Sequence, residues 1–227
     1  MSRASTRRPA RGWMCFEMPE YAVYECTRPA CGLRFPAETD SLEAARCPRC
    51  GADTREAARF PAPARRETAP PEGSLPLEAL LDNLRSAWNT GSIFRIADGA
   101  GVRHLYLCGI TPSGEHPRVP KTALGAEKTV GWSSHLNAVR TAEELIQGGC
   151  TLWALETTPQ AVPLFDLLPC RSEKPLVLVV GNERAGVDPG LLSLCARHVC
   201  LPMQGSKESL NAAVAFGIAA YALRQAR

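Results

Sequence analysis

The chain has 227 residues, of which 45% are hydrophobic, and 26 basic against 23 acidic residues give it a net charge of +3. This length suits one large domain, or an ordinary domain with a small appendage, and the composition excludes a fibrous or wholly disordered protein. The longest apolar run, residues 212–223, is too short to cross a bilayer. No apolar segment typical of a secretory signal follows the early arginines, so we expect a cytoplasmic protein without a membrane partner.

Residues 1–21 form a basic tail that contains Arg3, Arg7, Arg8 and Arg11. A tail of this kind can follow a phosphate backbone, or it can simply keep the chain in solution. The net charge of the whole chain is too small for a non-specific nucleic-acid coat. The sequence leaves both roles of the tail open.

Four of the ten cysteines are paired within residues 22–53. Cys26 and Cys31 are separated by four residues, Cys47 and Cys50 by two, and a glycine follows each pair. Four thiolates at these spacings can close a tetrahedral zinc site, which so short a segment needs in order to fold. The pattern predicts a zinc ribbon, with iron as the other metal that suits four thiolates and an unligated loop as the alternative.

Prolines are frequent after the cysteine pairs, at positions 61, 63, 70, 71 and 76. Between them lie mainly alanine, arginine and glutamate, which cannot bury enough surface to fold. We therefore expect residues 54–74 to be an extended linker and residues 75–227 to form the main domain.

Short apolar runs alternate with helical patterns through this main domain. The predicted strands are residues 75–81, 104–108, 151–156, 176–180 and 198–202, and the predicted helices are residues 89–100, 141–147 and 209–225. Residues 176–180 are apolar at every position, as expected of a strand covered by helices on both faces. The alternation predicts an α/β fold with a mostly parallel sheet, in which ligands bind at the carboxyl ends of the strands.

Three segments of this domain are unusually rich in polar residues and glycine: residues 83–95, 181–186 and 201–211. Each has an ordinary explanation when taken alone. Ser209 can cap a helix, and Gly181 and Gly186 can occupy turns. In this order, however, the segments resemble motifs one, two and three of the SpoU (TrmH-type) RNA methyltransferases of the SPOUT superfamily. Residues 121–127 resemble a further segment of that family, and the resemblance covers residues 75–227 but not the cysteine pairs.

The resemblance implies transfer of a methyl group from S-adenosylmethionine to a ribose 2′-hydroxyl of RNA. It further implies a C-terminal trefoil knot and a homodimer in which two subunits share each site. A tRNA substrate is our first expectation and rRNA the alternative. A catalytically silent RNA-binding protein of the same fold is a third possibility, and the presence of all the polar motif residues favours the enzyme.

Individual residues match the family's functional positions. The matches to cofactor contacts are Leu155, Gly181, Leu201 and Leu210, although the leucines could equally be core residues. The matches to catalytic positions are Asn89, Arg95, Glu183, Ser209 and Asn211. Because a guanidinium group does not lose its proton in proteins, we expect Arg95 to bind a phosphate and stabilise developing negative charge rather than act as a base. In front of this domain, Arg28, Arg34, Arg46 and Arg49 suggest that the ribbon grips RNA, with a protein partner as the alternative.

Overall fold

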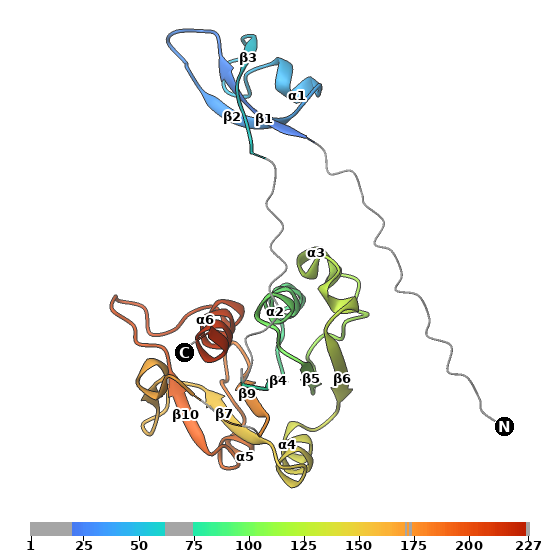
Figure 1. The fold of residues 1–227 in the computed structure, drawn as a ribbon, viewed down its shortest axis with the longest axis vertical. Helices are drawn as coiled ribbons and strands as arrows, with labels where there is room; N and C mark the ends of the chain where they lie inside the picture. The colour runs from blue at the N-terminus through green and yellow to red at the C-terminus, as the bar shows by residue number, and fades with distance from the viewer. Residues whose placement is uncertain (1–19, 62–74, 171, 173, 226–227) are drawn as a thin grey trace, which may run out of the picture. The chain divides into compact units, whose positions relative to one another are not determined.

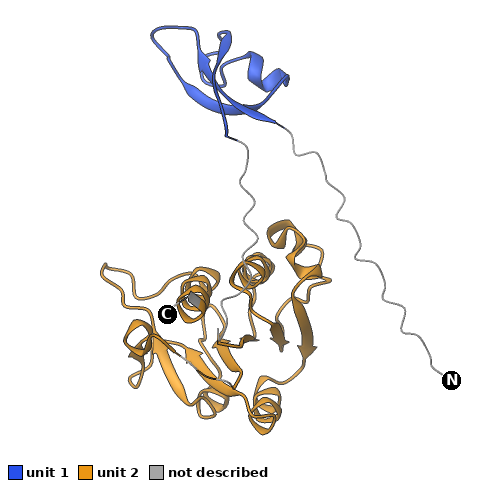
Figure 2. Cartoon of the chain, viewed as in Figure 1, with its two compact units in different colours: residues 1–67 blue, residues 68–227 orange. Residues whose placement is uncertain are grey.

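The computed structural model describes residues 20–61, 75–170, 172 and 174–225, and every structural statement below concerns these residues. The basic tail up to residue 19 and most of the expected linker lie outside them. The chain divides into two compact units, residues 1–67 and residues 68–227 (Figure 2). Each unit is described by itself.

The smaller unit is a three-stranded antiparallel sheet in the order β2-β1-β3 (Figure 1). Its elements are β1 (Tyr21–Cys26), β2 (Arg34–Glu38), α1 (Leu42–Ala45) and β3 (Thr54–Arg59). The expectation that the linker starts at residue 54 is therefore wrong. Strand β3 pairs with β1 through its backbone, while its side chains are almost all exposed. Because backbone pairing rather than apolar burial stabilises this strand, the alanines and charged residues of its sequence give no strand pattern.

The larger unit has a seven-stranded sheet in the order β6-β5-β4-β9-β7-β10-β8, and its paired strands are all parallel. The strands are β4 (Leu77–Asp82), β5 (His104–Cys108), β6 (Gly131–His135), β7 (Thr151–Leu155), β8 (Val162–Pro163), β9 (Leu176–Val180) and β10 (Arg197–Cys200). This arrangement confirms the predicted α/β class with a mostly parallel sheet. The trefoil knot stays a prediction from the resemblance.

Helices cover both faces of this sheet (Figure 1). They are α2 (Ala87–Ala100), α3 (Pro120–Ala123), η1 (Ala126–Lys128), α4 (Ala138–Gln147), η2 (Leu164–Leu167), α5 (Pro189–Leu192) and α6 (Ala212–Gln225). Strand β9 is buried at every position, and its side chains alternate between two apolar clusters on opposite faces. None of the helices in the described part of the chain is long and apolar enough to span a membrane.

Three helix starts differ from the expectation: α4 begins at Ala138 rather than at residue 141, and capping side chains set the other two. Helix α6 begins at Ala212 rather than at Ser209, because the Asn211 side chain accepts hydrogen bonds from the amides of Ala213 and Val214. Helix α2 begins at Ala87, where the hydroxyl of Ser86 accepts a hydrogen bond from the Asn89 amide. Both caps are polar side chains that satisfy amides of the first turn, and one of several adjacent candidates takes that role in each case.

Helix α3 packs directly onto the backbone of α2 at Gly91. A β-carbon added at Gly91 would lie 2.1 Å from Thr122 Oγ1 and 2.4 Å from the Val119 carbonyl oxygen. The Thr122 hydroxyl donates to the carbonyl of Trp88 over 3.1 Å and closes the contact. The segment that resembles the family between motifs one and two is thus held against the helix of motif one.

We predict that Gly91→Ala destabilises the larger unit. Alanine favours a helix interior by up to about 1 kcal/mol over glycine, but overpacking costs about 1–3 kcal/mol, so we expect a net loss of about 1–2 kcal/mol. Urea unfolding followed by tryptophan fluorescence measures this difference. The matched control is Gly205→Ala, where an added β-carbon meets no atom within 4 Å; equal stability of the two variants would contradict the prediction.

Candidate active site and metal centre

A pocket of about 330 Å³ lies where the loops after β7, β9 and β10 meet the start of α6. This is the carboxyl end of the parallel sheet, where α/β proteins bind ligands. The lining residues include Leu155–Thr157, Val180–Arg184, Gly186, Cys200, Leu201, Met203, Glu208–Ala212 and Ala215. Its volume falls within the range of small-molecule sites, and its walls combine apolar side chains with a few polar groups.

All four residues that match cofactor contacts line this pocket: Leu155, Gly181, Leu201 and Leu210. They come from three separate segments, namely the last residue of β7, the loop after β9 and the loop after β10, which the fold brings together. At Gly181 the chain passes so close to its own return that a β-carbon would lie 2.3 Å from Gly186 C and Val187 N. A glycine is therefore required there for a steric reason as well as for any approach of a ligand.

A chain of hydrogen bonds at the edge of the pocket joins three of the five residues that match catalytic positions. The carboxylate of Glu183 accepts from Asn89 Nδ2 over 2.8 Å, and Asn89 Oδ1 accepts from Asn211 Nδ2 over 3.0 Å. Glu183 follows β9, Asn89 lies in the first turn of α2, and Asn211 caps α6. Ser209 lines the same pocket.

Glu183 is held at the N-terminus of α2. Its carboxylate also accepts hydrogen bonds from the amides of Arg85 and Ser86, over 2.9 and 3.1 Å. Burial opposes the ionised form, but the hydrogen bonds from Arg85, Asn89 and Ser86 outweigh it and lower the pKa of Glu183 below the usual value. The helix dipole favours the same charge at this position. The site therefore presents a fixed carboxylate near neutral pH.

Arg95 is not part of this arrangement. It does not line the pocket, and its side chain is exposed on α2. It lies six positions after Asn89, which places the two side chains about 120° apart around the helix axis. The structure thus brings four of the five predicted residues together at one pocket of the chain and leaves Arg95 on another side of α2.

Sequence reasoning missed three polar residues that hold the loop after β9. Asn182 donates to the carbonyl of Asn83 over 2.6 Å and accepts from the amides of its own loop. Buried Asp82 accepts from the Asp188 amide over 2.9 Å, and Glu156 accepts from the Val187 amide over 3.1 Å. Each of Asp82, Glu156 and Asn182 lies within two residues after the last apolar residue of a parallel strand, and this position is the signal that could have identified them.

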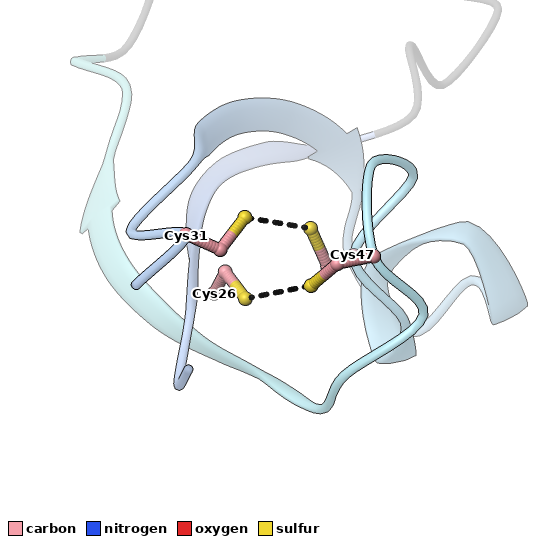
Figure 3. Close-up of side chains that lie close together, drawn as sticks. Cys26, Cys31 and Cys47 are labelled. Atoms are coloured by element: carbon pink, nitrogen blue, oxygen red, sulfur yellow. Dashed lines mark hydrogen bonds between the residues drawn. The ribbon is translucent and has the colours of Figure 1, made fainter. Parts of the chain in front are cut away.

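The four paired cysteines of the smaller unit converge, and Figure 3 shows Cys26, Cys31 and Cys47 among them. Their sulfur atoms all lie within 4.8 Å of one another, with 3.5 Å between Cys26 and Cys50 and 3.8 Å between Cys31 and Cys47. These distances are too long for disulfides. They match the edge of a tetrahedron with metal–sulfur bonds of about 2.3 Å, which is about 3.8 Å long. The donor set and its spacing fit a zinc ion.

The surroundings of Cys26 and Cys47 shift the pKa values of their thiols in opposite directions. Burial raises the pKa of Cys26 to about 12, whereas at Cys47 the amides of Arg49 and Cys50 outweigh burial and lower the pKa to about 7. Gly32 and Gly51 both have positive φ, as expected where a chain turns sharply after a thiolate. The amides of Arg49 and Cys50 thus stabilise the ionised form of Cys47, which is the form that binds a metal.

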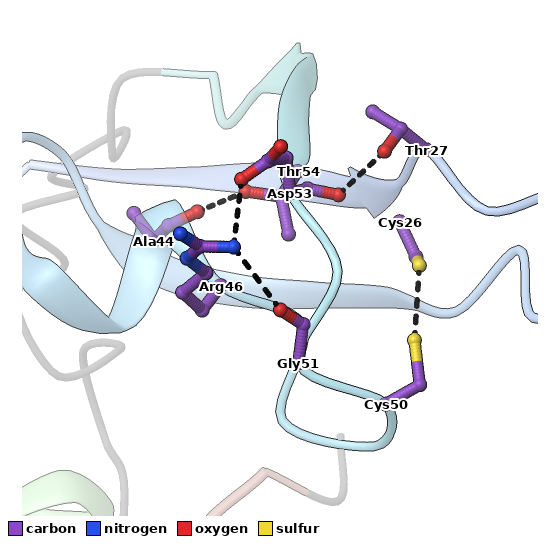
Figure 4. Close-up of polar contacts among 8 residues, drawn as sticks. All are labelled: Cys26, Thr27, Ala44, Arg46, Cys50, Gly51, Asp53 and Thr54. Carbon is purple, nitrogen blue, oxygen red and sulfur yellow. Dashed lines mark hydrogen bonds and ion pairs between the residues drawn. The ribbon is translucent and has the colours of Figure 1, made fainter.

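Polar contacts tie the second cysteine pair to the sheet (Figure 4). Arg46 forms an ion pair with Asp53 over 3.1 Å and donates to the carbonyl of Gly51, and the Thr54 hydroxyl donates to the carbonyl of Ala44. Of the four arginines expected to face RNA, Arg34 and Arg46 are engaged in ion pairs, with Glu25 and Asp53 respectively. Arg28 and Arg49 are exposed. A grip on RNA by the smaller unit stays a prediction.

Comparison with known proteins decides the family. The SpoU rRNA methylase family matches residues 76–221. The chain belongs to this family. The match includes the pocket and its polar network and excludes the cysteine cluster.

Individual relatives of this chain agree with the assignment to the SpoU family. The chain is 35% identical over 151 residues to the 23S rRNA (guanosine-2′-O-)-methyltransferase RlmB of Ralstonia nicotianae, a match covering 66% of this chain and 59% of the relative. Among solved structures, the A. aeolicus TrmH/SpoU tRNA modifying enzyme is 29% identical with a TM-score of 0.57, covering 64% of this chain and 72% of that one. The AdoMet-bound rRNA methyltransferase of Sinorhizobium meliloti is 26% identical, also with a TM-score of 0.57, covering 68% and 57%.

The hydrogen bonds to Glu183 predict a pH-dependent loss of stability in Glu183→Gln. A carboxylate whose folded pKa is lowered stabilises the protein above its unfolded pKa, about 4.3, and this contribution disappears as the pH falls through the folded pKa. We expect the variant to be less stable by about 1 kcal/mol at neutral pH. This loss is small because solvent screens an exposed carboxylate, and the difference in stability should vanish in acid. Denaturant unfolding across pH measures it. Exposed Glu143→Gln is the control; a difference that grows in acid would contradict the prediction.

Proposed function

We propose that this protein transfers a methyl group from S-adenosylmethionine to a ribose 2′-hydroxyl of RNA. The observation that carries the proposal is the hydrogen-bonded chain of Glu183, Asn89 and Asn211 beside a pocket lined by all four cofactor-matched residues. The AdoMet-bound S. meliloti relative supports the choice of cofactor. Of the three relatives described above, two are named for rRNA and one for tRNA, and tRNA remains our first expectation.

The residues at the site would have separate roles in holding the cofactor, orienting the ribose and binding the RNA phosphate. Bound S-adenosylmethionine supplies a methyl group carried on a sulfonium centre. Gly181 and the three leucines would hold the cofactor through backbone contacts and apolar walls, and the fixed carboxylate of Glu183 suits a cationic cofactor. Ser209 and the two asparagines would orient the ribose, so that positioning supplies much of the rate. Arg95 would bind the RNA phosphate and stabilise negative charge on the 2′-oxygen, while solvent or phosphate accepts the proton.

The test is methyl transfer from labelled S-adenosylmethionine into bulk tRNA and, separately, rRNA, followed by digestion to nucleosides. We expect label in a 2′-O-methylated nucleoside from one pool, which also identifies the substrate class. Label on a base would contradict the proposed acceptor. Protein that neither binds the cofactor nor labels either pool would favour the silent RNA-binding alternative.

We further propose a homodimer in which each pocket receives Arg95 from the second subunit. Arg95 lies outside the pocket of its own chain, so a shared site is the arrangement that lets it act. Next to α2, helix α6 exposes an apolar stripe of Val214, Ile218 and Tyr221, with exposed fractions of 50, 39 and 45%. The opposite face of α6 packs in the core through Phe216. A second subunit would cover the exposed stripe.

Mixed dimers test this shared site. Arg95→Ala and Glu183→Ala should each lose at least about tenfold in activity, because each removes one half of every site. Coexpressed with different affinity tags, the two variants should recover roughly a quarter of wild-type activity, since half of the dimers are mixed and each has one intact site. No recovery in a verified mixed dimer would contradict the shared site, and so would a monomeric wild-type protein.

We propose that Cys26, Cys31, Cys47 and Cys50 hold a structural zinc ion. The support is the close spacing of the four sulfur atoms, together with the amides of Arg49 and Cys50 that favour the ionised form of Cys47. Within residues 20–61, the smaller unit has few buried apolar side chains, namely Ala22, Ala37 and Ala44 besides two of the cysteines. Metal ligation would replace the missing core.

Metal analysis of purified protein should find about one zinc per chain. Cys47→Ser should lose the metal and unfold the smaller unit, whereas Cys170→Ser, outside the cluster, should retain it. Mass spectrometry for metals and proteolysis of the smaller unit measure the two effects. Iron in place of zinc would correct the metal, and metal-free protein with an intact ribbon would refute the structural role.

A further inference from the structure

The loop after β7 and the loop after β9 are joined through the carboxylate of Glu156. This residue directly follows Leu155, the last residue of β7, and its side chain is half-buried. One oxygen accepts from the amide of Thr157 over 3.0 Å, and the other accepts from the amide of Val187 over 3.1 Å. A single side chain thus binds a backbone group of each loop.

The space around this carboxylate is filled on the side of Gly186. A β-carbon at Gly186 would lie 2.6 Å from Glu156 Oε2. On its other side, the Gly186–Val187 backbone touches Gly181 at the end of β9. The carboxylate therefore sets how closely the returning part of the second loop can approach β7, through contact as well as through hydrogen bonding.

The same loop is held independently from the side of β4. Asn182 donates to the carbonyl of Asn83, and Asp82 accepts from the amide of Asp188. Neither Asp82 nor Asn83 lines the pocket, whereas Glu156 and Gly186 both do. Removing the Glu156 link should therefore leave the loop attached to β4 and alter the spacing of the two walls of the pocket.

We infer that Glu156 is a positioning residue for cofactor binding, which fixes the spacing between residues 155–157 and residues 181–187. This inference rests on the proposed function, because it assigns the pocket to S-adenosylmethionine. Ordering the walls of a pocket when a ligand binds costs free energy and reduces affinity. If the walls are already spaced correctly in the free protein, this cost is avoided. Glu156 acts through the two loops and not on the transferred methyl group.

The test variant is Glu156→Gln, which keeps the size of the side chain. An amide offers only one acceptor oxygen, so either Thr157 or Val187 then faces an N–H donor and loses its partner. We expect S-adenosylmethionine to bind about tenfold more weakly by calorimetry, with kcat at saturating cofactor changed by less than about threefold. Hydrogen exchange at whichever of the Thr157 and Val187 amides loses its partner should accelerate in the cofactor-free variant while β9 stays protected.

Glu143→Gln, on the exposed surface of α4, is the matched control and should change none of these quantities. Unchanged affinity, or unchanged exchange at both Thr157 and Val187, in Glu156→Gln would overturn the inference. A parallel fall in affinity, kcat and thermal stability would also overturn it, because it would indicate a general structural role. Wild-type protein that does not bind S-adenosylmethionine would instead refute the proposed function, and the inference would fall with it.

Discussion

The contact between the backbone at Gly181 and the backbone of Gly186 and Val187 is the constraint on which the pocket depends. The chain leaves β9, forms a tight loop closed by two hydrogen bonds between Asn182 and Gly186, and returns against its own start. No side chain fits between the two passes. This close return gives the loop a fixed shape, places Glu183 near its tip and leaves the pocket open beside it.

Electrostatics then links this loop to the rest of the site. The Glu183 carboxylate bonds to residues more than ninety positions earlier in the chain, at the N-terminus of α2, where unpaired amides and the helix dipole favour a negative charge. Through Asn89 the link extends to Asn211, which at the same time caps α6. The side chains that would orient substrate are thus the ones that hold the helix ends together, so the geometry of the site and the packing of α2 and α6 are coupled.

The smaller unit follows a different physical principle. Its sheet buries few side chains, and β3 is exposed along nearly its whole length. Four converging thiols occupy the place that an apolar core has in the larger unit. A metal ion suits such a unit because coordination energy does not require the buried area that a short chain lacks.

Local patterns in the sequence predicted what depends on local chemistry. The uniformly apolar Leu176–Val180 is the central strand, and the spacing of the cysteines predicted a cluster that does converge. By contrast, β3 and β6 carry too few apolar residues to show a strand pattern. Backbone pairing with strands β1 and β5 stabilises them instead, and local sequence does not reveal such pairing. Nor does sequence show which of several adjacent polar residues caps a helix.

The sequence by itself determined the α/β class, the family and the four cofactor-matched residues that line the pocket, because these follow from hydrophobic alternation and from motifs that are contiguous along the chain. Only the tertiary structure decided that Glu183, Asn89 and Asn211 form one hydrogen-bonded chain, that Glu156 joins two loops, and that Arg95 lies outside its own pocket. Those facts depend on the direction of each side chain and on which backbone groups from distant segments come within hydrogen-bonding distance, and neither is encoded in local sequence order.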